Sequence, residues 1–305
     1  MKTICLAIAM LFLYSCKKDN ETIEAAPEST EAPATVTVTA PVSKPASTTP
    51  TLIAEFLAKK KEVQLKLASL SAEEANDLYD SYKKENDSIM RQLEHNEQNI
   101  LEHYYKYYSD DRGNPKAAPD SIAKKEALLK SAGIEFWEIG EGMVEIRTVA
   151  NFYLSLFKGH VTKDYEDFIA LLAKDDENLY SADAGIAISF NAVGKRVLNW
   201  EKFINKHPYS RLTPQAIDFY RMYQYGFLLG EDNTPTIEVT DNSIYPENLK
   251  EFATFTAANP SSPTTALIKI VTETKGTKDE ITNAVAKEQD KLIAKLIADT
   301  TPDYR

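Results

Sequence analysis

The chain has 305 residues, of which 27% are charged and 43% hydrophobic, the balance of an ordinary globular protein. Its formal net charge is −11. Because a surface this acidic repels the phosphate groups of nucleic acids, a nucleic-acid-binding function is not expected.

The N-terminus has the pattern of a secretory signal. A charged start at Met1-Lys2-Thr3 precedes an apolar run, 4–14, that is shorter than the roughly 20 residues a membrane-spanning helix needs. Leu13-Tyr14-Ser15-Cys16 then resembles the lipobox of bacterial lipoproteins, whose cysteine is lipidated and becomes the new N-terminus. The resemblance implies a signal peptide over residues 1–15 and a lipid on Cys16. A short membrane anchor and an ordinarily cleaved signal are the alternatives.

Residues 16–50 are predicted to be the lipidated cysteine and a disordered tether. Residues 17–50 contain seven threonines, six alanines and five prolines but no aromatic residue, a composition that cannot bury enough apolar surface to fold. The charged start of the tether, 17–21, resembles a signal that sorts some lipoproteins to the cell surface, and a plain polar spacer is an equal alternative. We therefore expect an envelope protein attached to the outer membrane by its lipid, on either face.

Residues 51–133 are predicted to form a long helical hairpin and a short helix. Apolar residues recur at helical spacing from Leu52 to Leu67 and from Leu78 to Tyr108, with a capping box at Ser71-Ala72-Glu73-Glu74 between them. Gly133 is expected to end the short helix.

Residues 134–305 are predicted to form a helical domain that opens with one small β-hairpin or flap. The turn Gly140-Glu141-Gly142 between apolar residues favours the hairpin, over residues 134–147. Helices are then expected at 149–157, 165–172, 182–191, 197–206, 214–229, 245–258, 263–273 and 279–298.

A turn pattern occurs twice in this domain. Phe203 leads to His207-Pro208-Tyr209-Ser210, and 52 residues later Phe255 leads to Asn259-Pro260-Ser261-Ser262. Stacked helix–turn–helix units of this kind build α-solenoids. The predicted fold class is all-α: an irregular helical-hairpin bundle or short solenoid-like array, with a long N-terminal helix pair and the small hairpin.

Several short segments between Phe136 and Glu273 form a further pattern. They are Glu141-Gly142, Tyr180, Asp183-Ala184-Gly185, Ile188-Ser189, Trp200-Glu201-Lys202-Phe203, His207-Pro208, Tyr225-Gly226-Phe227-Leu228-Leu229-Gly230 and Asp232-Asn233-Thr234-Pro235. On these segments the region resembles a loosely defined family of secreted or lipid-anchored bacterial helical proteins without assigned activity. The stretch from Phe203 to Ser210 also looks like the joint between tetratricopeptide-type helices. Both resemblances imply an architecture and no reaction.

No catalytic motif is recognisable, and neither an enzyme nor a cofactor is expected. The chain lacks a G-x-S-x-G elbow and a glycine-rich phosphate loop. His95 and His103 lie too far apart along one helix to share a metal ion. Glutamates of the expected hairpin could supply a glycosidase pair, although a solvent-facing ribbon explains them better. They are Glu135, Glu138, Glu141 and Glu145.

The weak candidate for a metal site is the loop after residue 229. Glu231, Asp232 and Asn233 offer three oxygen-bearing side chains that could hold Ca²⁺. The same residue types are common in ordinary turns, so a structural loop is the favoured alternative.

Two clusters of tyrosines are the candidate binding residues. One lies at 104–108 and the other at 220–225, and we expect their rings to form a surface for a partner. The residues predicted to contribute are Tyr104, Tyr105, Tyr108, Tyr220 and Tyr223. Amphipathic core packing is the alternative.

The expected function is that of a non-catalytic envelope lipoprotein that binds or scaffolds a partner protein or an envelope polymer. The tether, the stacked helical hairpins and the lack of a catalytic motif all favour it. A carboxylate-dependent hydrolase acting on envelope glycan is the alternative. It requires two carboxylates about 5–10 Å apart in a cleft.

Overall fold

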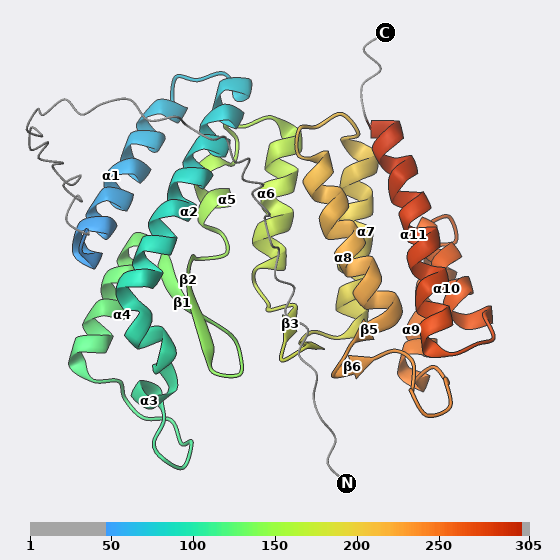
Figure 1. Ribbon diagram of the computed structural model, residues 1–305. Helices are drawn as coiled ribbons and strands as arrows, with labels where there is room; N and C mark the ends of the chain where they lie inside the picture. Colours follow the sequence, from blue (N-terminus) through green and yellow to red (C-terminus); the bar gives the residue numbers. More distant parts are fainter. Residues whose placement is uncertain (1–46, 301–305) are drawn as a thin grey trace, which may run out of the picture. The chain divides into compact units, whose positions relative to one another are not determined.

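The computed structural model describes residues 47–300, which contain eleven α-helices and three two-stranded antiparallel hairpins (Figure 1). The predicted all-α fold class with a small β element is therefore confirmed. These residues belong to one compact unit. The predicted boundary at residue 133, between the helical hairpin and the helical domain, lies inside this unit. The predicted signal peptide, Cys16 and the tether up to residue 46 lie outside the described residues.

The N-terminal helix pair consists of α1, Thr49–Leu67, and α2, Ala72–Glu102, which pack against each other. Helix α1 starts two residues inside the predicted tether because Pro50, in its first turn, favours a helix start. The capping box is present: the Ser71 hydroxyl accepts from the Glu74 amide, and the Glu74 carboxylate accepts from the Ser71 amide.

Two short helices and the expected hairpin follow. Helix α3 spans Tyr104–Tyr108, and α4 spans Asp120–Ala132 before Gly133 ends it in a left-handed conformation. Strands β1, Ile134–Gly140, and β2, Met143–Thr148, then form the predicted hairpin. This hairpin packs on α2 through β2 and on α4 through β1.

From β1 onward the chain consists of three consecutive units of one hairpin followed by two helices. The first unit is β1–β2 with α5, Phe152–Phe157, and α6, Lys163–Asp175. The second is β3, Ser181–Ala182, and β4, Gly185–Ile186, with α7, Phe190–Lys206, and α8, Thr213–Leu229. The third is β5, Gly230–Glu231, and β6, Thr234–Pro235, with α9, Pro246–Ala258, and α10, Pro263–Glu273. Helix α11, Lys278–Thr300, ends the described chain.

The repeated turns join α7 to α8 and α9 to α10 with one set of hydrogen bonds. In each turn three backbone amides and one threonine hydroxyl donate to equivalent carbonyls. In the first turn the pairs are His207 to Phe203, Ser210 to His207, Thr213 to Ser210 and the Thr213 hydroxyl to His207. In the second they are Asn259 to Phe255, Ser262 to Asn259, Thr265 to Ser262 and the Thr265 hydroxyl to Asn259. The repeat read from the sequence is therefore confirmed at its turns.

The three hairpins lie at the same end of the helices (Figure 1) and pack on one another. The helix predicted at 182–191 is wrong, because residues 181–186 form the second hairpin. Asp183 and Ala184 occupy the left-handed backbone region at its turn. The Asn233 amide donates to the Ala184 carbonyl and the Ile186 amide to the Thr234 hydroxyl, so the third hairpin holds the second in place.

Asp167 on α6 links two helices of the array through its carboxylate. Lys206, at the end of α7, donates to it at 2.6 Å, His207 bonds it at 2.8 Å, and Lys163 donates from the same helix as Asp167. Partial burial acts to raise the pKa of Asp167, but these hydrogen bonds outweigh it and hold the pKa well below its ordinary value.

Asp167→Asn is expected to lower the free energy of unfolding by about 1–2 kcal/mol at pH 7. Because the folded-state pKa is depressed, the carboxylate stabilises the fold fully above its unfolded pKa of about 4. This contribution declines as pH falls below that value and is lost as pH falls through the depressed folded-state pKa. Urea unfolding at pH 7 and pH 3 should therefore show a difference between variant and wild type that shrinks at pH 3. Asp77→Asn, at an exposed ion pair with Arg211, is the control. A deficit equally large at both pH values would contradict the assignment.

Candidate functional site

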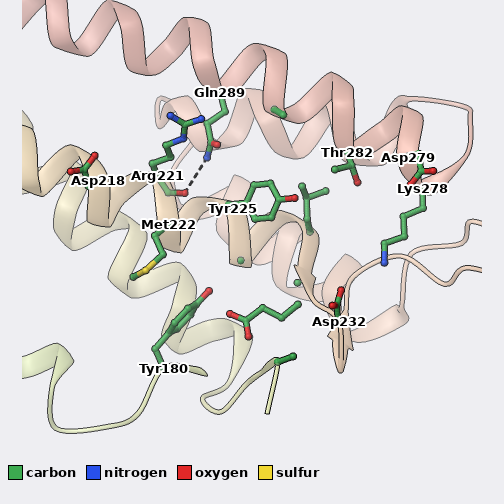
Figure 2. A pocket seen from close by; sticks show the side chains of 16 residues that line it. Tyr180, Asp218, Arg221, Met222, Tyr225, Asp232, Lys278, Asp279, Thr282 and Gln289 are labelled. Atoms are coloured by element: carbon green, nitrogen blue, oxygen red, sulfur yellow. Dashed lines mark hydrogen bonds between the residues drawn. The ribbon is translucent and has the colours of Figure 1, made fainter. Parts of the chain in front are cut away.

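An open groove of about 740 Å³ lies among the described residues. Its walls are the outer face of α8, the β5–β6 hairpin and the first half of α11 (Figure 2). The lining residues are Tyr180, Ala184, Asp218, Arg221, Met222, Tyr225, Gly226, Leu229, Gly230, Glu231, Asp232, Lys278, Asp279, Thr282, Ala286 and Gln289.

Helical spacing on α8 decides which side chains reach the groove. Tyr220 and Tyr223 face the core, with exposed fractions of 0% and 4%. Met222 and Tyr225 lie on the opposite side of the helix, with exposed fractions of 42% and 41%, and line the groove. An aromatic ring and a thioether are thus available to a ligand.

The prediction that Tyr220 and Tyr223 belong to a binding surface is wrong. The Tyr220 hydroxyl lies between Gln224 and Thr264 in the core, and the Tyr223 hydroxyl accepts a hydrogen bond from Arg196. Burial raises the pKa of both tyrosines. Core packing, the alternative, therefore describes these two side chains.

The first tyrosine cluster lies outside the groove, on α3. Tyr104 and Tyr108 stack with their ring centroids 4.5 Å apart and are half-buried, and the Tyr108 hydroxyl donates to Glu126 at 2.8 Å. Tyr105 is exposed and donates to Glu138 of the hairpin. The two clusters do not form one continuous surface, because the members predicted on α8 are buried.

The hairpin β5–β6 brings the predicted metal-loop residues to the groove. Glu231 and Asp232 line it, and Glu231 accepts a hydrogen bond from the Ser181 hydroxyl. The Asn233 side-chain amide donates to the Asp183 carbonyl and so joins two hairpins. Within residues 47–300 no group of three or more histidine, cysteine, aspartate or glutamate side chains could hold a metal ion.

Helix α11 forms the far wall of the groove and is fixed to α8 by a buried glutamine. The Gln289 amide donates to the Arg221 carbonyl at 3.1 Å (Figure 2) and to the Gln224 side-chain oxygen at 3.0 Å. The Arg221 guanidinium pairs with Asp290 at 2.6 Å. Hydrogen bonds of Gln289 and the ion pair between Arg221 and Asp290 therefore fix α11 to α8.

The charged side chains gather at the two ends of the groove, with Tyr225 between them. Figure 2 shows Lys278, Asp279 and Asp232 at one end and Asp218 at the other. Asp218, Asp232 and Asp279 are exposed, and their carboxylates make no hydrogen bond or ion pair with another described residue. The lining holds four carboxylates and two basic side chains, one of which is already paired with Asp290.

Tyr180 is one of the lining residues that the sequence did not predict as part of a site. Its ring meets Tyr223 edge-on at 5.0 Å, and its hydroxyl lies so close to Gly226 that a Cβ there would be 1.9 Å away. Burial raises the pKa of Tyr180. Gly226, inside the last turn of α8, was the available signal, since an interior helical glycine often marks a close approach of another group.

Neither a family model, a characterised protein nor a solved structure matches this chain. The likeness to secreted helical proteins therefore stays a prediction. In the part of the chain that the structure describes, no helix is both long and apolar enough to cross a bilayer.

Proposed function

We propose that this chain is a non-catalytic, lipid-anchored protein of the cell envelope that binds a partner protein or an envelope polymer in the α8–α11 groove. The observation that carries the proposal is that Tyr225 and Met222 are both exposed in a groove that also holds unpaired carboxylates. Aromatic and methionine side chains are enriched in interfaces, where they fill pockets of the partner and exclude water.

The charge of the groove favours one class of ligand. Its carboxylates outnumber its basic side chains, and Asp218, Asp232 and Asp279 have no partner among the described residues. Opposite charge on the ligand would speed its approach and fix its register. A basic, extended segment of a partner protein is therefore the ligand that the groove suits best.

Replacing both Tyr225 and Met222 by alanine is expected to weaken partner binding about tenfold or more, because anchors of this kind carry most of an interface's energy. The lipidated protein, immobilised, would be used to capture partners from envelope extracts, and the affinity for the captured partner would then be measured. Tyr209→Ala is the matched control, since Tyr209 is 69% exposed and lies outside the groove. Equal binding by the double variant, or no specific partner for the wild type, would refute the proposal.

The hydrolase stays the alternative. A glycosidase needs one carboxylic acid kept in apolar surroundings so that it retains its proton. Asp218, Asp232 and Asp279 in the groove are exposed, which supports binding rather than hydrolysis there. Release of reducing ends from envelope glycan by the purified protein would favour the alternative.

A further inference from the structure

A second, more enclosed pocket of about 290 Å³ lies between α2, β2 and the C-terminal half of α6. It shares no lining residue with the α8–α11 groove. Its lining combines apolar side chains with charged ones contributed by all three elements. The apolar members include Met90, Ile169 and Leu172.

A buried tyrosine with an unused hydroxyl lines this pocket. Tyr79 is 2% exposed, and its ring is held edge-on by Tyr153, Phe157 and Tyr165 at centroid distances of 5.3–5.8 Å. Its hydroxyl makes no hydrogen bond with any other residue in 47–300. The ring is buried, but the hydroxyl oxygen keeps some exposure where Tyr79 lines the pocket, so it is free to contact a ligand there.

The pocket carries an excess of negative charge. It is lined by Asp87, Glu94, Glu145 and Asp176, and by the basic residues Lys83, Arg91 and Arg147. Arg147 is already paired at 3.0 Å with Glu135, which lies outside the pocket. The four carboxylates are thus opposed by two remaining cations, and two negative charges are unmatched.

Glu145 is the most distinctive of these carboxylates. It is half-buried, and its carboxylate makes no hydrogen bond or ion pair with another described residue. Burial raises the pKa of Glu145, and the charges of Glu94 and Asp176 raise it further against the opposing effect of Arg147. A positive group beside the Glu145 carboxylate would favour its ionised form and so oppose these effects on its pKa.

We propose that this pocket binds a short aliphatic diamine with both nitrogens protonated. The ammonium groups pair with Glu145 and Asp176, whose carboxylates make no hydrogen bond or ion pair with another described residue. The methylene chain lies along Met90, Ile169 and Leu172. The Tyr79 oxygen accepts a hydrogen bond from an ammonium group, which has only donors to offer. This site goes beyond the function proposed for the groove and does not depend on it.

Titration calorimetry of the purified protein with 1,4-diaminobutane tests the proposal. Saturable one-to-one binding is expected for the wild type, and Glu145→Gln and Asp176→Asn should each weaken it about tenfold or more, because each removes a charged hydrogen bond. Tyr79→Phe should weaken it severalfold while keeping the ring contacts. Butylamine, with one nitrogen, should bind more weakly than the diamine, and 1,4-butanediol should not bind.

Two controls separate this site from general charge attraction and from the groove. Glu141→Gln removes an exposed carboxylate from the turn of the same hairpin and should leave diamine binding unchanged. The double variant of Tyr225 and Met222 should also bind the diamine as the wild type does. Glu145→Gln removes no hydrogen bond or ion pair of the side chain and takes away a charge that burial disfavours, so it should unfold at or above the temperature of the wild type. Absence of saturable binding, or unchanged affinity in Glu145→Gln, would overturn the proposal.

Discussion

Replacing Arg196 by methionine is expected to lower the free energy of unfolding by about 3–5 kcal/mol, because it leaves a buried carboxylate without its cation. The Arg196 guanidinium pairs with Asp175 at 3.3 Å and donates to the carbonyls of Asp175 and Asn178 at 2.7 and 2.9 Å. It also donates to the Tyr223 hydroxyl at 3.0 Å. One side chain on α7 therefore ties the end of α6 to α8.

The burial of the Asp175 carboxylate explains why Arg196→Met should lower the stability so much. Burial raises its pKa, although a hydrogen bond from Trp200 at 2.8 Å and the charge of Arg196 act to lower it. Without Arg196, the ionised carboxylate would have to stay buried or take up a proton. Adding Asp175→Asn to Arg196→Met should therefore restore part of the lost stability, since it removes the uncompensated charge.

Denaturant unfolding of the single and double variants measures both effects. Lys195→Met is the matched control, because Lys195 is the exposed neighbour of Arg196 on α7 and should change stability by no more than about 0.5 kcal/mol. A single variant as stable as the wild type would show that the ion pair contributes nothing to the fold.

Gly230→Ala is the second change with a large expected effect, a loss of about 3 kcal/mol or more from backbone strain and a steric clash together. Gly230 ends α8 with φ 74° and ψ −163°, a conformation that favours glycine. A Cβ at this position would lie 2.2 Å from the Thr234 carbonyl oxygen and 2.8 Å from the Thr236 amide nitrogen. The hairpin β5–β6 would have to open, and the groove wall would move with it.

Gly159→Ala separates the two causes. Gly159 also has a positive φ, of 80°, but a Cβ there would meet no atom within 4 Å. It should cost only about 1 kcal/mol. Equal losses in the two alanine variants, measured by thermal unfolding, would mean that the contact with Thr234 is not a close one.

Much of the helical architecture was readable from the sequence because it depends on local chemistry. The capping box at Ser71, the hairpin around Glu141 and the two repeated turns each follow from residues within a few positions of one another. The hairpin at 181–186 was missed because its stability comes from Asn233 and Thr234, about 50 residues away. A single-sequence pattern contains no sign of that pairing.

Only part of the candidate groove could be predicted from the sequence, for a similar reason. The segment 220–225 and the loop at Glu231 were both singled out, and both contribute to it. The choice of Tyr220 and Tyr223 over Tyr225 failed because tyrosine suits a core and an interface equally well. Only the packing of α7 and α10 decides which face of α8 is covered. The contribution of Lys278 and Asp279 depends on where α11 docks, which the sequence pattern does not indicate.

The position of α11 links ligand binding in the groove to the stability of this C-terminal helix. Among the described helices α11 lies at one edge and packs on α8 and α10, and an edge helix detaches more readily than a central one. Helix α11 is also one wall of the groove, held to α8 by Gln289. A ligand that touches both walls therefore binds only while α11 is packed on α8. By mass action, its binding stabilises that packed state. Occupancy of the groove and protection of the C-terminal helix from proteolysis would rise together.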